Sequence, residues 1–247
     1  MAGHSKWANI KFRKGLQDAK RGKIFTKLIR EISVSARMGG GDESSNARLR
    51  DAVSKALKAN MKRDTIDNAI KRGVGGLEGA HMVEMRYEGY GPGGVALIVD
   101  CLSDNKNRTV SEVRHAFTKH GGNLGTDGSV SYLFKEQGEI LLAPTDKEEE
   151  AMEVAIDAGA VDVNLDEGQI EIITTADAYH AMLAALDAHH FELEHSHVVM
   201  RAQTTVSLDE DTLQSLEKLI DMLEDLDDVQ AVHSNAEYSE PSVESVG

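Results

Sequence analysis

The side chains of this chain that are best suited to chemistry are the cations near its N-terminus. Nine Lys and Arg occur between residues 6 and 30, and Asp18 is the only acid among them. Such cations bind the phosphates of nucleic acids whatever the base sequence, because each contact releases condensed counterions. Trp7, Ile10 and Phe12 alternate with the first cations, and an exposed aromatic ring can stack on an unpaired base.

We therefore predict a nucleic-acid-binding surface at this end of the chain. The alternative is a solvated helix face with one aromatic residue that fills a helical core, and the lack of balancing acids disfavours it. The residues expected to bind are Lys6, Trp7, Lys11, Arg13, Lys14, Lys20, Arg21, Lys23, Lys27 and Arg30.

A second, smaller basic patch is predicted at Lys106, Arg108 and Arg114. It lies where a loop leads into a helix and could extend the binding surface. Asn105 and Asn107 fit this interpretation, and they fit equally well a loop whose asparagines cap the helix.

Residues 89–94 match the G-x-G-x-x-G pattern of dinucleotide-binding loops letter by letter. That chemistry requires the loop to lead from a strand into a helix, whose N-terminus then meets the pyrophosphate. Here β-branched and apolar residues follow the loop, so it is expected to join two strands. We interpret the motif as a hairpin turn and predict no cofactor.

A histidine cluster raises the question of a metal site: His189, His190, His195 and His197 lie near Glu192 and Glu194. No H-x-x-x-H pair and no thiolate accompanies them, so a polar strand edge and loop is the favoured interpretation, and no metal is predicted. Ser103, Asp104 and His115 form no nucleophile–base signature, and G-x-S-x-G is absent from the sequence. The chain is therefore not expected to be an enzyme.

The elements that must carry these residues differ in charge. Residues 1–75 hold 18 basic and 7 acidic side chains, whereas residues 136–247 hold 3 basic and 28 acidic ones. The whole chain has a formal net charge of −15, which hides this cationic end. A division of this kind indicates nucleic acid or another anionic surface as the partner of the basic end.

The basic end is predicted to be a three-helix domain that follows an extended arm at residues 1–15. Apolar residues recur with helical spacing from about Gln17 to the glycines 39–41, with Lys and Arg on the opposite face. A second helix is expected to start near residues 44–46, and a third to end at Gly73. The glycines at 73–76 are interpreted as a domain linker.

Beyond this linker the pattern is that of alternating strands and helices. Strands are expected at 82–88, 94–102, 129–134, 139–142, 161–164, 169–174, 198–208 and 229–233. Helices are expected at 108–119, 147–157, 177–188 and 210–226.

These elements predict an α+β multidomain protein. After the helical domain come two α/β sandwich-like modules with mainly antiparallel sheets, one inserted in the other. The predicted divisions are a basic helical domain at 1–76, a middle domain of 77–134 plus 198–240, an inserted acidic domain at 135–197, and a tail at 241–247.

Composition indicates a cytoplasmic protein. The one cysteine, Cys101, lies in an apolar run and is expected to be reduced and buried. No stretch approaches the roughly 18 apolar residues of a membrane helix, and no apolar run follows the first residues as in a secretory signal. No membrane partner is therefore expected.

Five motifs of the chain closely resemble the YebC family, which includes the mitochondrial translational activator of cytochrome c oxidase. They are AGHSKWANIK at 2–11, DAKRGKIFTK at 18–27, YEGYGPGG at 87–94, TVSEVRHAF at 109–117 and GGNLGTDGSV at 121–130. The resemblance implies a helical domain and two α/β domains, the last inserted into the middle one. It brings no cofactor and no catalytic residue.

The resemblance also implies a nucleic-acid-binding regulator of gene expression. One version is a DNA-binding transcriptional regulator. Against it, the third helix offers few side chains to base edges, and the acidic region would be repelled by flanking duplex. The alternative is a ribosome-associated translation factor that binds ribosomal RNA through the basic N-terminal domain.

Overall fold

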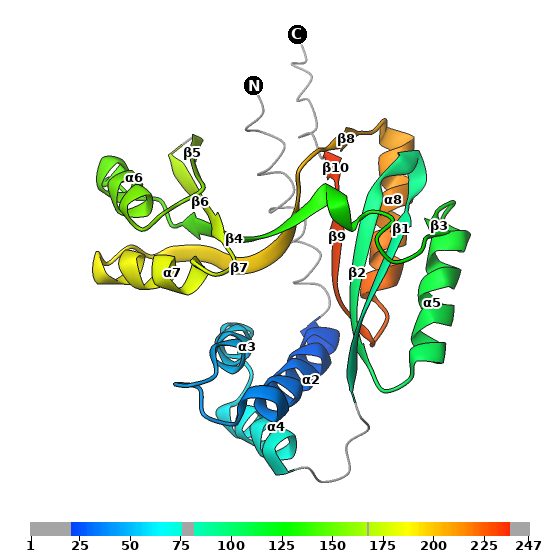
Figure 1. Ribbon diagram of the computed structural model, residues 1–247, viewed down its shortest axis with the longest axis horizontal. Coiled ribbons are helices and arrows are strands. Elements are labelled where there is room, and N and C mark those ends of the chain that lie inside the picture. Colours follow the sequence, from blue (N-terminus) through cyan, green and yellow to red (C-terminus); the bar gives the residue numbers. More distant parts are fainter. Residues whose placement is uncertain (1–20, 76–81, 167, 238–247) are drawn as a thin grey trace. The chain divides into compact units, whose positions relative to one another are not determined.

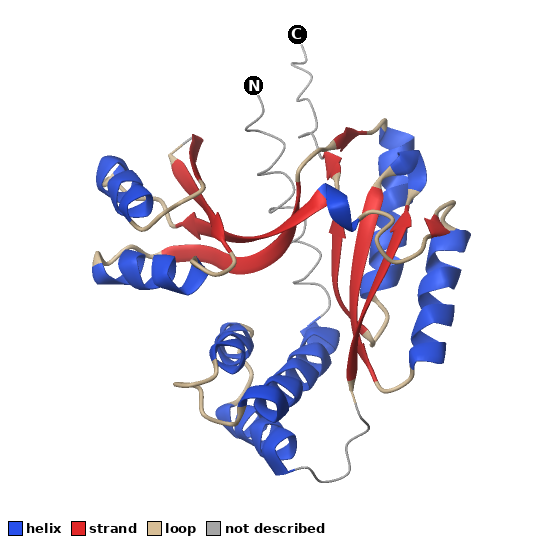
Figure 2. Ribbon diagram, viewed as in Figure 1, coloured by secondary structure: helices blue, strands red, loops and turns tan. Residues whose placement is uncertain are grey.

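The computed structural model describes residues 21–75, 82–166 and 168–237 (Figure 1). The expected basic arm at 1–15 lies outside these residues. The described chain forms two compact units: unit 1 comprises residues 131–207 and 235–237, and unit 2 comprises residues 21–130 and 208–234. The fold is α+β, as predicted, with helices and antiparallel sheets in separate layers (Figure 2).

Unit 2 begins with a three-helix domain, as the spacing of the apolar residues predicts. Its helices are α2 (Arg21–Gly39), α3 (Ala47–Lys58) and α4 (Arg63–Gly75). Their shared core contains Ile32, Leu49, Val53, Met61 and Ile66, each at most 4% exposed. We call this part the helical domain.

Two asparagines define the ends of α3. Asn46 Oδ1 accepts from the N–H of Leu49 at 3.1 Å, which makes Asn46 the N-cap among the three residues that the sequence left open. At the other end Asn60 has φ +62°, and the N–H of Met61 donates to the carbonyl of Ala56 at 2.9 Å. This is a Schellman ending, in which the buried Met61 supplies the apolar contact.

The rest of unit 2 is a four-stranded antiparallel sheet with two helices. The strands are β1 (Val83–Tyr90), β2 (Ala96–Ser103), β3 (Asn123–Leu124) and β9 (Val229–Ser234), in the order β3-β1-β2-β9. Helices α5 (Lys106–Lys119) and α8 (Glu210–Glu224) contact each other and the sheet. Leu97 of β2 lies beside Leu216 and Leu219 of α8 in this core.

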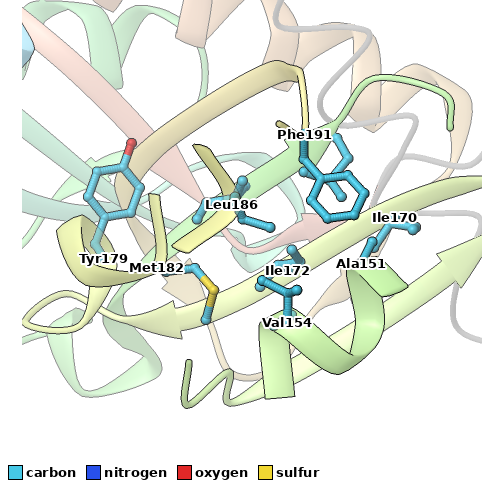
Figure 3. Packing of buried hydrophobic residues seen from close by; sticks show 11 residues of the cluster. Ala151, Val154, Ile170, Ile172, Tyr179, Met182, Leu186 and Phe191 are labelled. Atoms are coloured by element: carbon cyan, nitrogen blue, oxygen red, sulfur yellow. The ribbon is translucent and has the colours of Figure 1, made fainter. Parts of the chain in front are cut away.

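Unit 1 is a βαββαβ module. Its elements are β4 (Phe134–Leu142), α6 (Glu148–Asp157), β5 (Asp162–Asp166), β6 (Gln169–Thr175), α7 (Tyr179–Ala188) and β7 (Leu193–Ala202). The antiparallel strand order β5-β6-β4-β7 is that of a split βαβ fold. Figure 3 shows the core between helices and sheet, where Val154 of α6 and Met182 of α7 approach Ile172 of β6. The short strands β8 (Val206–Ser207) and β10 (Ala236–Glu237) pair in parallel.

Two expected strands differ in the structure. Residues 131–133 form a 3-10 turn, η2, and the strand begins at Phe134 and continues to Leu142, so 129–134 is no separate strand. The strand expected at 198–208 begins at Leu193 and pairs with β4 in unit 1. The sequence predicts a polar strand edge and loop around His195 and His197, and the structure places both within β7, where they follow the two-residue period of a strand. The division into three domains at the predicted boundaries stays a prediction.

Candidate nucleic-acid interface

The predicted binding residues fall into two groups. Those of the arm lie outside the described residues: Lys6, Trp7, Lys11, Arg13, Lys14 and Lys20. Arg21 is the first residue of α2, and Lys23, Lys27 and Arg30 follow on that helix.

Lys23, Lys27 and Arg30 all reach the C-terminal end of α8. Lys23 Nζ donates to the carbonyl of Asp225 at 3.1 Å and lies 3.2 Å from its carboxylate. Lys27 Nζ donates to the carbonyl of Glu224 at 2.9 Å. Arg30 donates to the carbonyl of Asp227 at 2.6 Å and to Asp228 Oδ1 at 3.0 Å. The basic face of α2 therefore contacts residues 224–228, which we call the α8 end.

The α8 end attracts cations for two reasons. The last carbonyls of a helix lack partners within it, and the helix dipole places partial negative charge there. In addition, the last turn of α8 carries no basic residue, and Glu224 and Asp225 add negative charge where the dipole disfavours it. The cations of α2 donate hydrogen bonds to the free carbonyls and place positive charge beside these acidic residues.

Asp228 is the most deeply buried carboxylate of this contact, at 2% exposure. It accepts hydrogen bonds from Arg30, and also from Arg108, Ser103 and Thr109 at 2.9–3.1 Å. Burial alone would raise its pKa, but the hydrogen bonds from Arg108, Ser103 and Thr109 outweigh burial and hold the pKa below its ordinary value. Asp228 thereby joins α2, β2, α5 and β9.

The second predicted patch divides in the structure. Arg108 donates to Asp228 and to Asp104, so it is bound within the fold. Lys106 and Arg114 are exposed on α5. Asn105 Oδ1 accepts from the N–H of Arg108 at 3.0 Å, which shows that this asparagine caps α5.

Sequence reasoning did not single out a further set of cations on the helical domain. These are exposed, and no ion pair joins them to another described residue: Arg37, Lys55, Lys58, Lys62, Lys71 and Arg72. Lys58, Asn60 and Lys62 flank the turn between α3 and α4, where the buried Met61 leaves its neighbours facing solvent. We call Lys55, Lys58 and Lys62 the α3–α4 corner. The signal available in the sequence was the run of lysines around a helix-ending Asn.

The glycine motif at 89–94 joins β1 to β2 through the 3-10 turn η1 (Pro92–Gly94), as expected of a hairpin. Gly93 has φ +70° and Gly94 φ +74°, a conformation that favours glycine. A Cβ at Gly122 would lie 2.7 Å from the carbonyl of Tyr90, so the two glycine-rich loops touch backbone to backbone. The buried Glu88 carboxylate accepts from the N–H groups of Gly128 at 3.0 Å and Val130 at 2.8 Å. The glycines of the two loops thus allow the loop backbones to pack closely against each other.

The four clustered histidines, His189, His190, His195 and His197, lie in unit 1. His195 and His197 of β7 place their Nε2 atoms 3.2 Å apart, and Arg201 on the same strand binds Glu139 at 2.8 Å and Glu171 at 3.2 Å. Within residues 21–75, 82–166 and 168–237, no group of three or more His, Cys, Asp or Glu has an arrangement suited to a metal.

Two further features concern chemistry and membranes. Cys101 is buried, and burial raises the pKa of its thiol to about 12, so the reactive thiolate is scarce at neutral pH. None of the helices in the described part of the chain combines the length and the apolar character needed to cross a membrane.

Comparison with known proteins covers nearly the whole chain. Residues 5–76 match the model of the TACO1/YebC protein N-terminal domain, and residues 82–236 match that of the TACO1/YebC second and third domain. A protein of Legionella pneumophila strain Philadelphia 1, named probable transcriptional regulatory protein, is 74% identical over 246 residues, which is 100% of both chains.

More distant relatives carry the same name. One from Idiomarina loihiensis is 58% identical over 97% of each chain, and one from Francisella tularensis subsp. novicida is 55% identical over 100% of each. The crystal structure of a conserved hypothetical protein from Aquifex aeolicus superposes with a TM-score of 0.81 at 47% identity, covering 92% of this chain and 94% of that one.

Proposed function

Because the chain belongs to the TACO1/YebC family, we propose that it is a nucleic-acid-binding regulator of gene expression that acts in transcription by binding DNA. The names of its relatives, which are those of probable transcriptional regulators and not of enzymes, support this proposal. The observation that carries it is the cationic N-terminal part of the chain: residues 1–75 combine 18 basic with 7 acidic side chains. Phosphate contacts from such a domain supply affinity for any duplex.

A second candidate is a ribosome-associated translation factor that binds ribosomal RNA through the same domain. An observation on α4 favours it. A recognition helix reads base edges with its N-terminal residues, but the first turns of α4 carry Asp64 and Asp67. Arg63, the one cation there, is held by Glu43 at 2.5 Å and Asp67 at 3.0 Å. Binding through backbone phosphates or unpaired bases suits this helix better than reading a duplex.

One experiment separates the two candidates. Cell extract is sedimented through a sucrose gradient at low and moderate salt, and the wild-type chain is compared with a variant in which Lys6, Lys11, Arg13 and Lys14 are Ala. The matched control replaces four exposed lysines outside the helical domain by Ala: Lys119, Lys135, Lys147 and Lys218.

The expected result for the transcriptional role is free sedimentation, with promoter fragments shifted in a sequence-dependent way that survives non-specific competitor. Co-migration with ribosomes that the arm variant loses and the control keeps would overturn it in favour of the ribosomal role. A purified chain that binds neither DNA nor RNA at micromolar concentration would refute both.

A further inference from the structure

We propose that the α8 end is an internal competitor for the nucleic-acid-binding face of α2, so that segment 224–228 and a nucleic acid exclude each other on Lys23 and Lys27. The inference rests on the proposed function and adds a regulation of its site. The same cations that sequence reasoning assigns to phosphate are bound, in this structure, by the chain's own oxygens.

The first argument is chemical likeness. A phosphate offers anionic oxygens to Lys at about 2.7–2.9 Å. The α8 end offers carbonyl oxygens of Glu224 and Asp225 at 2.9 and 3.1 Å and a carboxylate oxygen of Asp225 at 3.2 Å. A lysine has three N–H donors but only one positive charge. If a phosphate and the α8 end bound it together, their negative charges would repel each other, so the two compete for the lysine.

The second argument is the gradient of burial along the contact. The Lys23 and Asp225 side chains are 45% and 47% exposed, whereas the Asp228 side chain beside Arg30 is 3% exposed. Exposed ion pairs contribute little to stability, and buried ones are costly to break. Arg30 therefore acts as the fixed end of the contact and Lys23 as the exposed end that exchanges partners, with the half-buried Lys27 between them.

The third argument is what remains after exchange. With Lys23 and Lys27 on a phosphate, the end of α8 keeps the negative charge of Glu224 and Asp225 and has no basic residue in its last turn to offset it. That charge would then repel the nearby phosphate. The α8 end and a bound phosphate thus exclude each other, and the repulsion between them weakens as salt screens their charges.

The test compares two double variants of one helix. Asp225→Asn with Asp227→Asn removes two charges from the α8 end and leaves Asp228 intact. The control, Glu210→Gln with Asp211→Asn, removes two charges from exposed positions at the opposite end of α8. Affinity for fluorescein-labelled duplex DNA and single-stranded RNA is measured by anisotropy in low salt. We expect the first variant to bind about three- to ten-fold more tightly than wild type, because it loses the exposed Lys23–Asp225 pair, which contributes roughly a factor of a few, and because two charges that repel phosphate are gone. The control is expected to match wild type.

A second measurement follows the contact itself. Carbodiimide activates the Asp225 carboxylate, and the Lys23 amine displaces the resulting urea to form an amide. Peptide mass spectrometry quantifies this cross-link. Saturating nucleic acid is expected to lower its yield several-fold. Equal affinities of the two double variants, together with a cross-link that persists in the bound state, would overturn the inference while leaving the proposed function intact. A wild-type chain that binds neither probe would instead refute the proposed function, and the inference with it.

Discussion

At the scale of single residues, Asp228 connects segments that lie far apart in the sequence. It joins Arg30, which is 198 positions away in the sequence, and Arg108, which is 120 positions away. Nothing in a single sequence distinguishes this aspartate from Asp227 beside it, because its importance lies in partners that only the folded chain brings together. Asp227 is exposed and contributes only its backbone carbonyl to Arg30.

This difference leads to a prediction for the two neighbours. Asp228→Asn leaves Arg30 and Arg108 without their shared charge partner, so the free energy of unfolding should fall by about 3 kcal/mol, a typical cost for removing one side of a buried pair. Urea denaturation followed by circular dichroism measures it. Asp227→Asn, the matched control, should change stability by less than about 0.5 kcal/mol. Equal effects of the two substitutions would show that the buried carboxylate is unimportant.

The same carboxyl predicts a dependence of stability on pH. Its pKa is held below the ordinary 3.8 in the folded chain, so it binds a proton more readily when unfolded. The stabilisation is therefore fully present above 3.8 and is lost as the pH falls through the folded pKa. Urea titrations from pH 7 to 3 should show a constant gap between wild type and Asp228→Asn above about pH 5, which narrows below it. A gap that stays constant down to pH 3 would contradict this.

At the scale of elements, the structure of the helical domain depends on where its helices end and on how closely they cross. Its three helices could be predicted, because apolar residues recur at helical spacing. The expected end of the third helix at Gly73 was wrong, because Gly73 lies within α4, which continues to Gly75. The strand boundaries could be predicted less well. The polar His195 and His197 concealed the start of β7, and the turn at 131–133 interrupted a run that reads as strand. Both boundaries depend on which side of the strand is covered by neighbouring elements, and the local sequence pattern does not contain this information.

Gly73 provides a prediction for the crossing of α2 and α4. A Cβ at Gly73 would lie 2.3 Å from the carbonyl oxygen of Ser33, a backbone atom that cannot move aside. Gly73→Ala should therefore lower the free energy of unfolding by about 3 kcal/mol through overpacking. Gly75→Ala on the same helix meets nothing within 4 Å and should be neutral or slightly stabilising. Thermal unfolding of both variants tests the pair, and a Gly73→Ala chain as stable as wild type would rule out a tight crossing.

At the scale of the whole molecule, the division of charge is the feature that the sequence shows most clearly and the structure refines. Composition alone indicates that the basic end binds an anion. It does not show which cations are available, because that depends on where the acidic residues fold. Among the described residues, Lys23, Lys27 and Arg30 contact the α8 end, and Arg48 is bound by Glu31 at 2.7 Å. No acid from the described part of the chain pairs with the α3–α4 corner in this way.

The α3–α4 corner therefore supplies the last prediction. Replacing Lys55, Lys58 and Lys62 by Gln should weaken nucleic-acid binding and flatten its salt dependence. For duplex DNA each lost phosphate contact lowers the slope of log affinity against log salt by about 0.9, so the slope should fall by two to three if all three lysines engage the backbone. Anisotropy titrations from 50 to 200 mM salt measure it, with Lys119, Lys135 and Lys218 changed to Gln as the control of equal charge. A slope unchanged from wild type would place the phosphate contacts elsewhere on the basic end.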